Sequence, residues 1–201
     1  WVVSPCVVFP NSGTTLTVAK SASTLTLTIT DSSIASTTIA GIVWTASSKV
    51  KVSGNINGVT TGTMDGTISS INTSSHTMTL SVSGENWDSV VVGTYTASQF
   101  SDLTVMVYQR YVNSTYYPVG IFMNCYDTSN SSSTIRIYGG TATNPNVMIG
   151  NLTSAGLPAI AGVTPEGWGL YAANNAYISG VIYATSGSIG GFELSNNAIK
   201  T

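Results

Sequence analysis

Two carboxylates flank a tryptophan in segment 84–88, and no other arrangement in the sequence comes closer to a catalytic pair. Glu85 and Asp88 lie three residues apart, with Trp87 between them. Glycoside hydrolysis needs two carboxyl groups facing each other across the scissile bond, and an indole ring suits a sugar subsite. The alternative is a polar turn whose Trp87 packs back on the fold. Only these two of the eight acids are near neighbours, and we favour the turn.

The only histidine offers little further chemistry. His76 precedes an alternating segment, where we expect an exposed turn, and no nucleophile-elbow motif occurs in the sequence. One His and two distant Cys are too few ligands for a structural zinc ion in one chain. Three copies of His76 on a threefold axis remain a disfavoured alternative. We therefore expect no catalytic residue, no metal and no cofactor, and we expect that the chain is not an enzyme.

The two cysteines, Cys6 and Cys125, are far apart in sequence. One long-range disulfide and two free thiols are equally consistent with this spacing. Both residues have apolar neighbours, which favours buried free thiols.

Tyrosines cluster around a cation and a proline in segment 108–118. Tyr111, Tyr116 and Tyr117 lie close in sequence to Arg110, and aromatic rings with arginine are suited to stacking on sugars and hydrogen bonding to them. The alternative is a hairpin whose tyrosines cover the face of a β-sandwich. If the chain contacts a ligand, Trp87 and these three tyrosines are the candidate residues.

Composition separates this chain from ordinary cytosolic enzymes. Charged residues make up 7% of the 201 residues and the net charge is −2, against about 25% charged residues in typical domains. The six cations form no basic stripe, so we expect no nucleic-acid partner. No apolar run is long enough to span a bilayer, so we expect no membrane insertion. Hydrophobic residues at 42% still allow a substantial core.

Apolar and polar residues alternate in segments 24–30, 49–52, 77–82 and 103–108, as in half-buried strands. Pairs such as Asn57-Gly58 and Asp65-Gly66 predict tight turns between strands. We predict an all-β fold with an antiparallel, Ig-like β-sandwich over residues 11–125. Residues 1–10 would be a linker or an entering strand, and residues 126–166 would hold connecting strands.

The C-terminal stretch carries an internal repeat of 11 residues. Three glycines stand at this spacing, and each precedes a large apolar residue; the pairs are Gly169-Leu170, Gly180-Val181 and Gly191-Phe192. Three or four such short units cannot close a core in one chain. We therefore predict that residues 167–201 form an elongated, intertwined β segment of a homotrimer, in which these six residues pack at the trimer axis.

The C-terminal third resembles tail proteins of tailed bacteriophages that infect Gram-positive bacteria, described as tail-fibre, minor structural or host-specificity proteins. The similar stretches are 133–140, 146–150, 167–180 and 184–192, of which the strongest reads GWGLYAANNAYISG and continues to ATSGSIGGF. The resemblance implies an often trimeric virion protein near the tail tip. It supplies no ligand residues, and residues 1–133 match no family that we can name.

These observations lead to one expected function and one alternative. We expect a segment of a longer tail-fibre or tail-tip protein, assembled in the bacterial cytoplasm and located in the phage tail. Its expected partners are two copies of itself and other tail proteins, with a host cell-surface glycan as a candidate ligand. The alternative is a bacterial surface adhesin or carbohydrate-binding module.

Overall fold

The computed structural model describes residues 2–39, 42–124, 133–153, 156–160, 162–177, 179, 187–189, 192–195 and 198–200. Over these residues the fold is all-β, with one 3-10 turn, η1 (Trp87–Ser89), and no α-helix, so the all-β part of the predicted fold class is confirmed. The strands are β1 (Val2–Val3), β2 (Cys6–Phe9), β3 (Thr15–Lys20), β4 (Leu25–Thr30), β5 (Thr38–Ile39), β6 (Ile42–Val43), β7 (Lys49–Ile56), β8 (Val59–Asn72), β9 (Thr77–Gly84), β10 (Gly93–Thr96), β11 (Phe100–Val112), β12 (Thr115–Asn124), β13 (Thr134–Gly139), β14 (Val147–Asn151), β15 (Trp168–Ala172), β16 (Gly187–Ile189), β17 (Phe192–Ser195) and β18 (Ala198–Lys200).

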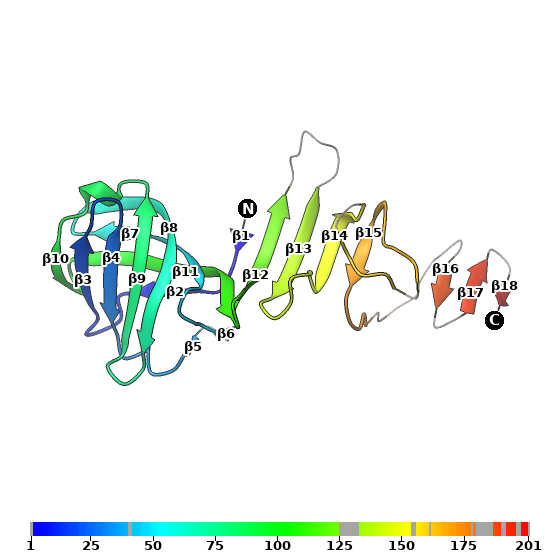
Figure 1. Ribbon diagram of the computed structural model, residues 1–201, viewed down its shortest axis with the longest axis horizontal. Coiled ribbons are helices and arrows are strands. Elements are labelled where there is room, and N and C mark those ends of the chain that lie inside the picture. The colour runs from blue at the N-terminus through cyan, green and yellow to red at the C-terminus, as the bar shows by residue number, and fades with distance from the viewer. Residues whose placement is uncertain are drawn as a thin grey trace.

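Hydrogen bonds join 13 of these strands into one large antiparallel sheet (Figure 1). Its order is β10-β3-β4-β9-β8-β7-β11-β12-β13-β14-β15, with β2 paired to β11 and β1 paired to β12 beside this path. A small sheet, β16-β17-β18, and the pair β5-β6 lie apart from it. The sequence predicted two packed sheets over residues 11–125, but the ladder joins these strands into one sheet that also continues beyond them.

The length of β11 explains this continuity. One edge of β11 pairs with β7 along most of its 13 residues. Its other edge pairs first with β2, from Leu103 to Met106, and then with β12, from Gln109 to Val112. β11 extends beyond the end of β2, so the edge of its last residues is free to pair with a further strand. That strand is β12, through which the sheet continues.

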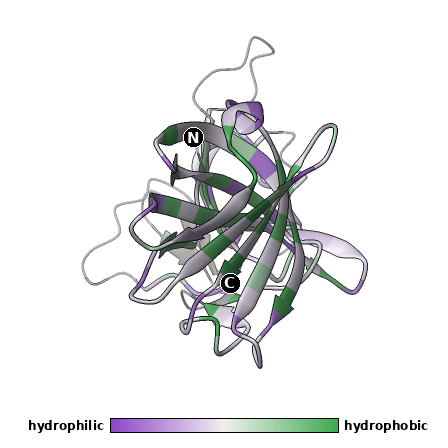
Figure 2. Cartoon of the chain, turned by 90° about the vertical axis from the view of Figure 1, so that its left-hand side faces the viewer, coloured by the Kyte–Doolittle hydropathy of each residue, from purple (hydrophilic) through white to green (hydrophobic). Residues whose placement is uncertain are grey.

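The strands from β2 to β11 curl around one hydrophobic core, and we call this part the curled module. Phe9 on β2 and Tyr95 on β10 lie near opposite ends of the strand order, yet both belong to the same buried cluster. The sheet must therefore bend round on itself, and Figure 2 shows strands of this module crossing one another. Trp44 is fully buried in the same core, where its indole N–H donates to the Ile39 carbonyl at 2.8 Å.

The period-2 patterns in the sequence correspond to strands that have one face on this core. Along β4, Leu25, Leu27 and Ile29 are fully buried, while the threonines between them are half-buried. β7, β9 and β11 follow the same alternation at their predicted positions. The prediction of half-buried strands at these four segments is confirmed.

The two predicted turn signals have different outcomes. Asn57 and Gly58 both have positive φ and close the two-residue hairpin between β7 and β8, as the type I′ turn requires. Gly66 instead lies inside β8, paired with Val50 on one side and Val82 on the other, so the turn predicted at Asp65-Gly66 is wrong. A Cβ there would come within 2.2 Å of the Ser81 carbonyl oxygen, so glycine is required for close strand approach.

Strands β12 to β15 lie in a row beyond the curled module, and we call them the extension (Figure 1). A second, smaller cluster is buried here, formed by Met148 and Tyr171 from the strands with Leu152 and Leu157 from the β14–β15 connection. This connection covers one face of the far end of the extension. The opposite face has no comparable cover from any part of the chain that the structure describes.

We predict that Leu27→Ala lowers the free energy of unfolding by about 2–5 kcal/mol, the range for truncating a leucine in a core that cannot collapse. Leu27 is fully buried in the curled module. Urea denaturation followed by tryptophan fluorescence measures the change. Thr26→Ala, at the adjacent half-buried position, is the matched control and should cost less than about 1 kcal/mol. Equal losses in both variants would contradict the assignment of the β4 faces.

Candidate functional site

The acidic turn at Glu85 and Asp88 has the features of a structural turn. Both acids are exposed, whereas Trp87 is half-buried and packs against the core of the curled module. Lys20 holds this turn in place: its ammonium lies 5.2 Å from the centre of the Trp87 ring and donates to the Asp88 carbonyl. One face of the indole is thus already next to a cation, which leaves less ring surface for a sugar.

Asp31 is the acid that the fold buries most clearly, and its contacts are all local. Its carboxylate accepts hydrogen bonds from Asn11 at 3.1 and 3.2 Å, from the Thr14 hydroxyl, and from the Ser33 backbone and side chain at 2.8 and 2.5 Å. Burial by itself would raise the pKa of Asp31, but these hydrogen bonds outweigh it and hold the pKa below its usual value. In its charged form, Asp31 therefore links the turn that contains Asn11 and Thr14 to the turn that contains Ser33.

His76 and Cys6 lie apart from any cluster of chemical groups. His76 lies in the β8–β9 turn with positive φ, as expected for a turn residue, but it is half-buried, with Nδ1 3.4 Å from the Ile34 carbonyl oxygen. Among the described residues, no three His, Cys, Asp or Glu side chains gather into a metal-binding group.

The prediction of a buried thiol is wrong for Cys6. It is a free, exposed cysteine on β2. Strand alternation turns Phe9 and Val7 toward the core, and Cys6 and Val8 therefore point outward. Apolar neighbours in sequence do not determine burial when the strand is half-buried. Cys125 lies outside the described residues.

Segment 108–118 forms the hairpin that the sequence offered as the alternative to a sugar-contacting cluster. Asn113 and Ser114 both have positive φ and close β11 onto β12, with Tyr111 opposite Tyr116. These two rings have centroids 4.8 Å apart, and the Lys49 ammonium lies 5.4 Å from the centre of the Tyr116 ring. Tyr117 is next to Tyr116 on the strand, so alternation turns it to the other face and away from this pair.

Arg110 is committed to the fold. Its guanidinium donates to the Gly140 carbonyl at 3.0 Å, which ties the hairpin to the connection between β13 and β14. Its buried Nε has no hydrogen-bond partner. The cation that the sequence placed among the tyrosines is therefore an anchor between the curled module and the extension.

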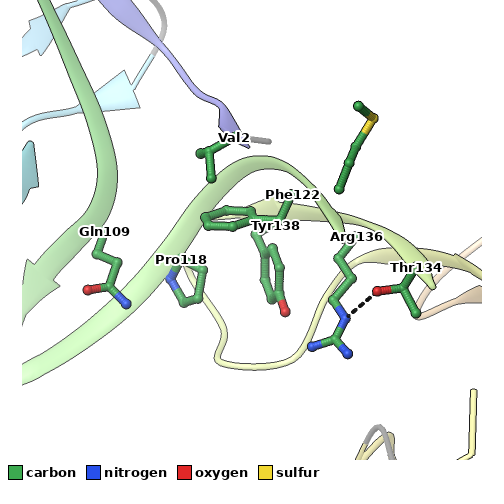
Figure 3. Close-up of a pocket in the computed structure, with 8 residues that line it drawn as sticks. Val2, Gln109, Pro118, Phe122, Thr134, Arg136 and Tyr138 are labelled. Carbon is green, nitrogen blue, oxygen red and sulfur yellow. Dashed lines mark hydrogen bonds between the residues drawn. The ribbon is translucent and has the colours of Figure 1, made fainter. Parts of the chain in front are cut away.

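A hollow that no sequence motif predicted opens beside this hairpin, with a volume of ≈310 Å³ (Figure 3). Gln109 and Pro118 line one side, and Phe122 and Tyr138 meet edge-on with centroids 5.3 Å apart. Arg136 lies beside Tyr138, and its Nε donates to the Thr134 hydroxyl at 3.2 Å. Within the described residues the only ion pair is Lys51–Asp65, so no carboxylate neutralises Arg136 there.

The hollow and the tyrosine pair share one face of the sheet. Tyr116, Pro118 and Phe122 are separated by even numbers of residues along β12, and Tyr111 and Tyr138 belong to strands paired with it on either side. Rings with a guanidinium and an amide are groups that can stack on a sugar and hydrogen bond to its hydroxyls. The signal in the sequence was the alternation in segment 134–138, whose polar positions include Arg136.

The opposite face of the extension is aliphatic and uncovered, and we call it the open face. Directly paired residues project to the same side, and the register places Met123, Ile135, Ile149 and Leu170 in one row across the four strands. Seven large apolar side chains of this face are exposed by 36 to 74% of their area: Ile121, Met123, Ile135, Ile137, Ile149, Trp168 and Leu170. Val119, two residues before Ile121, is still buried in the core of the curled module.

The structure describes only part of the predicted trimer-packing set. Leu170 lies on the open face and is 64% exposed, while Gly169 lies against Leu152 on the covered face. Gly180, Val181 and Gly191 lie outside the described residues, and Phe192 begins β17 without a described side chain. The phase of the 11-residue repeat therefore stays a prediction.

Comparisons with protein-family models, with curated proteins and with solved structures found no match to this chain. In the part of the chain that the structure describes, no helix has the length and apolar character needed to cross a membrane.

We predict that Asp31→Asn lowers the free energy of unfolding at neutral pH by roughly 1–3 kcal/mol, because it replaces a charged acceptor of several hydrogen bonds. The folded-state pKa lies below the unfolded value. The stabilisation is therefore complete above about pH 4 and is lost as the pH falls through the folded pKa. Urea denaturation between pH 7 and pH 2.5 should show a shallower acid loss in the variant. Asp88→Asn, at an exposed acid, is the control, and an equal flattening in both would contradict this role.

Proposed function

We propose that this chain is a structural segment of a bacteriophage tail fibre or tail tip, which contributes to virion architecture and to contact with the host surface. The observation that carries the proposal is the open face of the extension. Large exposed apolar patches mark sites of contact with other molecules, and this chain exposes seven large apolar side chains in one row of strands. A segment of a larger assembly needs such a surface.

Two further features support a structural part over an enzyme. The curled module holds the largest buried cluster, and its described acids are either exposed, as Glu85 and Asp88 are, or committed to a turn, as Asp31 is. The chain is also poor in charge, so its surface depends little on ion pairs that salt would screen. We propose no catalytic activity and no cofactor for this chain.

The proposal includes a finer architecture. Within residues 11–125, the strands β3 to β11 would serve as the Ig-like module, because the curled sheet packs parts of itself against one core as a sandwich does. Residues 167–201 would form the intertwined segment of a homotrimer with an 11-residue repeat, and other tail proteins would contact its ends. The similarity of this stretch to phage tail proteins, noted from the sequence, points the same way.

A bacterial adhesin or carbohydrate-binding module is the second candidate. The hollow beside the tyrosine hairpin favours it, because rings, a guanidinium and an amide are suited to glycan contact whichever particle carries them. The two candidates differ in where the protein is found.

Antibodies against this chain should label the distal end of the tail when phage particles that contain it are viewed by immunogold electron microscopy. Pre-incubation of the antibody with the purified chain should abolish the label, which controls for non-specific binding. Label on the surface of uninfected bacteria, with none on phage particles, would contradict the tail assignment and support the adhesin.

Host contact by the aromatic residues can be tested with purified cell-wall glycans. We expect the double variant Trp87→Ala with Tyr116→Ala to bind about tenfold or more weakly, because one lost stacking contact contributes on the order of 1 kcal/mol. Binding is measured on a glycan array and by calorimetry. Arg136→Gln separates the hollow from the hairpin: if only this variant loses binding, the contact lies in the hollow. Binding that survives all three substitutions would overturn the assignment of glycan contact to these aromatic residues and to the hollow.

A further inference from the structure

The open face combines two properties that suit it to an interface. It is continuous, because its residues are direct neighbours across four paired strands, and it is apolar. None of its seven exposed side chains carries a charge, and the only polar groups among them are the Trp168 N–H and the Met123 sulfur. The face therefore resembles one inner face of a β-sandwich without the second sheet that would cover it.

The uncovered area is large enough to matter. Exposed fractions of 36 to 74% on seven large side chains leave on the order of 500 Å² of apolar surface, if each residue has about 150 Å² when fully exposed, the lower end of the range for an aromatic side chain. This is near the upper end of the roughly 300–600 Å² expected for the largest patch on a monomer. A stable interface buries about 800 Å² per partner, somewhat over half of it apolar. The open face therefore supplies about the apolar part of one standard interface.

We propose that the open face is the interface between copies of this chain. A face without charge offers an unlike partner nothing to select by electrostatic complementarity. It suits copies of itself, because aliphatic side chains on identical faces can pack against one another around a shared axis, with few polar groups to bury besides the Trp168 N–H. Interfaces between identical chains are also the more apolar class.

Continuity with the rest of the fold points to the same occupant. Val119 is buried in the core of the curled module, and Ile121 and Met123 follow it on the same side of β12. The core of one chain thus continues, strand by strand, into a surface that a neighbouring chain would cover. Leu170, at the far end of the same row, is also the first apolar residue of the 11-residue repeat, so the interface would lead directly into the repeat.

This arrangement assigns opposite roles to the two faces of β12 and β13. Copies that meet through the open face would leave Arg136, Phe122 and Tyr138 directed away from the contact, toward solvent, whereas Met123 lines the hollow and also belongs to the open face. The inference rests on the proposed function only for the number of copies, which the tail-fibre assignment sets at three.

The experiment uses the 201-residue chain with a charge-balanced double variant, Ile135→Glu with Ile149→Lys. These residues are direct partners across β13 and β14, so the new charges pair favourably on a single chain, whereas an interface would have to bury both. The control is Val91→Glu with Val92→Lys, which places the same charges at residues that are 60% and 58% exposed outside the open face. Sedimentation velocity and light scattering give the mass from nanomolar to micromolar concentration.

We expect the unmodified chain and the control to associate at micromolar concentration, and the open-face variant to associate at least 100-fold more weakly. A monomeric unmodified chain, or an open-face variant that associates as tightly as the control, would overturn the proposal. A dimer that the open-face variant abolishes would keep the interface and overturn only the homotrimer of the proposed function. Absence of immunogold label from phage tails would likewise contradict the proposed function without contradicting the interface.

Trp168 provides a second measurement, which introduces no charge into the open face. It is 74% exposed in one chain, so acrylamide should quench it freely unless a second copy covers it. The difference in quenching between the unmodified chain and Trp168→Phe isolates its signal from the other three tryptophans. We expect quenching of Trp168 to fall severalfold when the chain associates and to recover on dilution. Full quenching in the associated state would place the contact elsewhere and overturn the proposal.

Discussion

The hydrogen-bond ladder along β11 and β12 is the constraint on which the rest of the structure depends. The first part of β11 is held between β7 and β2 inside the curled module, and its last residues pair only with β12 on the side that β2 has left. A strand edge that is paired along only part of its length leaves backbone N–H and C=O groups unpaired, and these groups must be paired with another strand or protected. Here it is completed by a hairpin whose second strand leaves the module and starts a new row of strands. Arg110 reinforces the junction through the Gly140 carbonyl.

Strict alternation along β12 then divides the chemistry of the chain between two faces. One side continues the core through Val119 and becomes the open face at Ile121. The other side carries Tyr116, Pro118 and Phe122, and with Arg136 from β13 it forms the aromatic hollow. Assembly and ligand contact would therefore be separated by the thickness of a single sheet. A change on one face need not alter the other.

Parts of this fold follow from short stretches of residues alone. Leu25, Leu27 and Ile29 alternate with threonine so regularly that only a half-buried strand fits, and Asn57-Gly58 fits only a tight hairpin turn. Gly66 and Cys6 show where such local patterns mislead. Asp-Gly resembles a turn signal, but Gly66 serves the close approach of the Ser81 carbonyl, and the apolar neighbours of Cys6 lie on alternate sides of a strand. Both errors have one cause: the contacts that a residue makes with neighbouring strands cannot be inferred from the residues next to it in the sequence.

The sequence by itself determined the strand class, the main alternating segments, the tyrosine hairpin and the scarcity of charge, because these depend on local periodicity, turn chemistry and composition. Only the tertiary structure decided that the strands form one sheet, that Tyr117 turns away from Tyr111 and Tyr116, and that Arg136 joins Phe122 and Tyr138. It also decided that Ile135, Ile149 and Leu170, which are distant in sequence, form one uncovered row. Register between strands sets all of these, and register depends on long-range pairing that no short stretch of residues can specify.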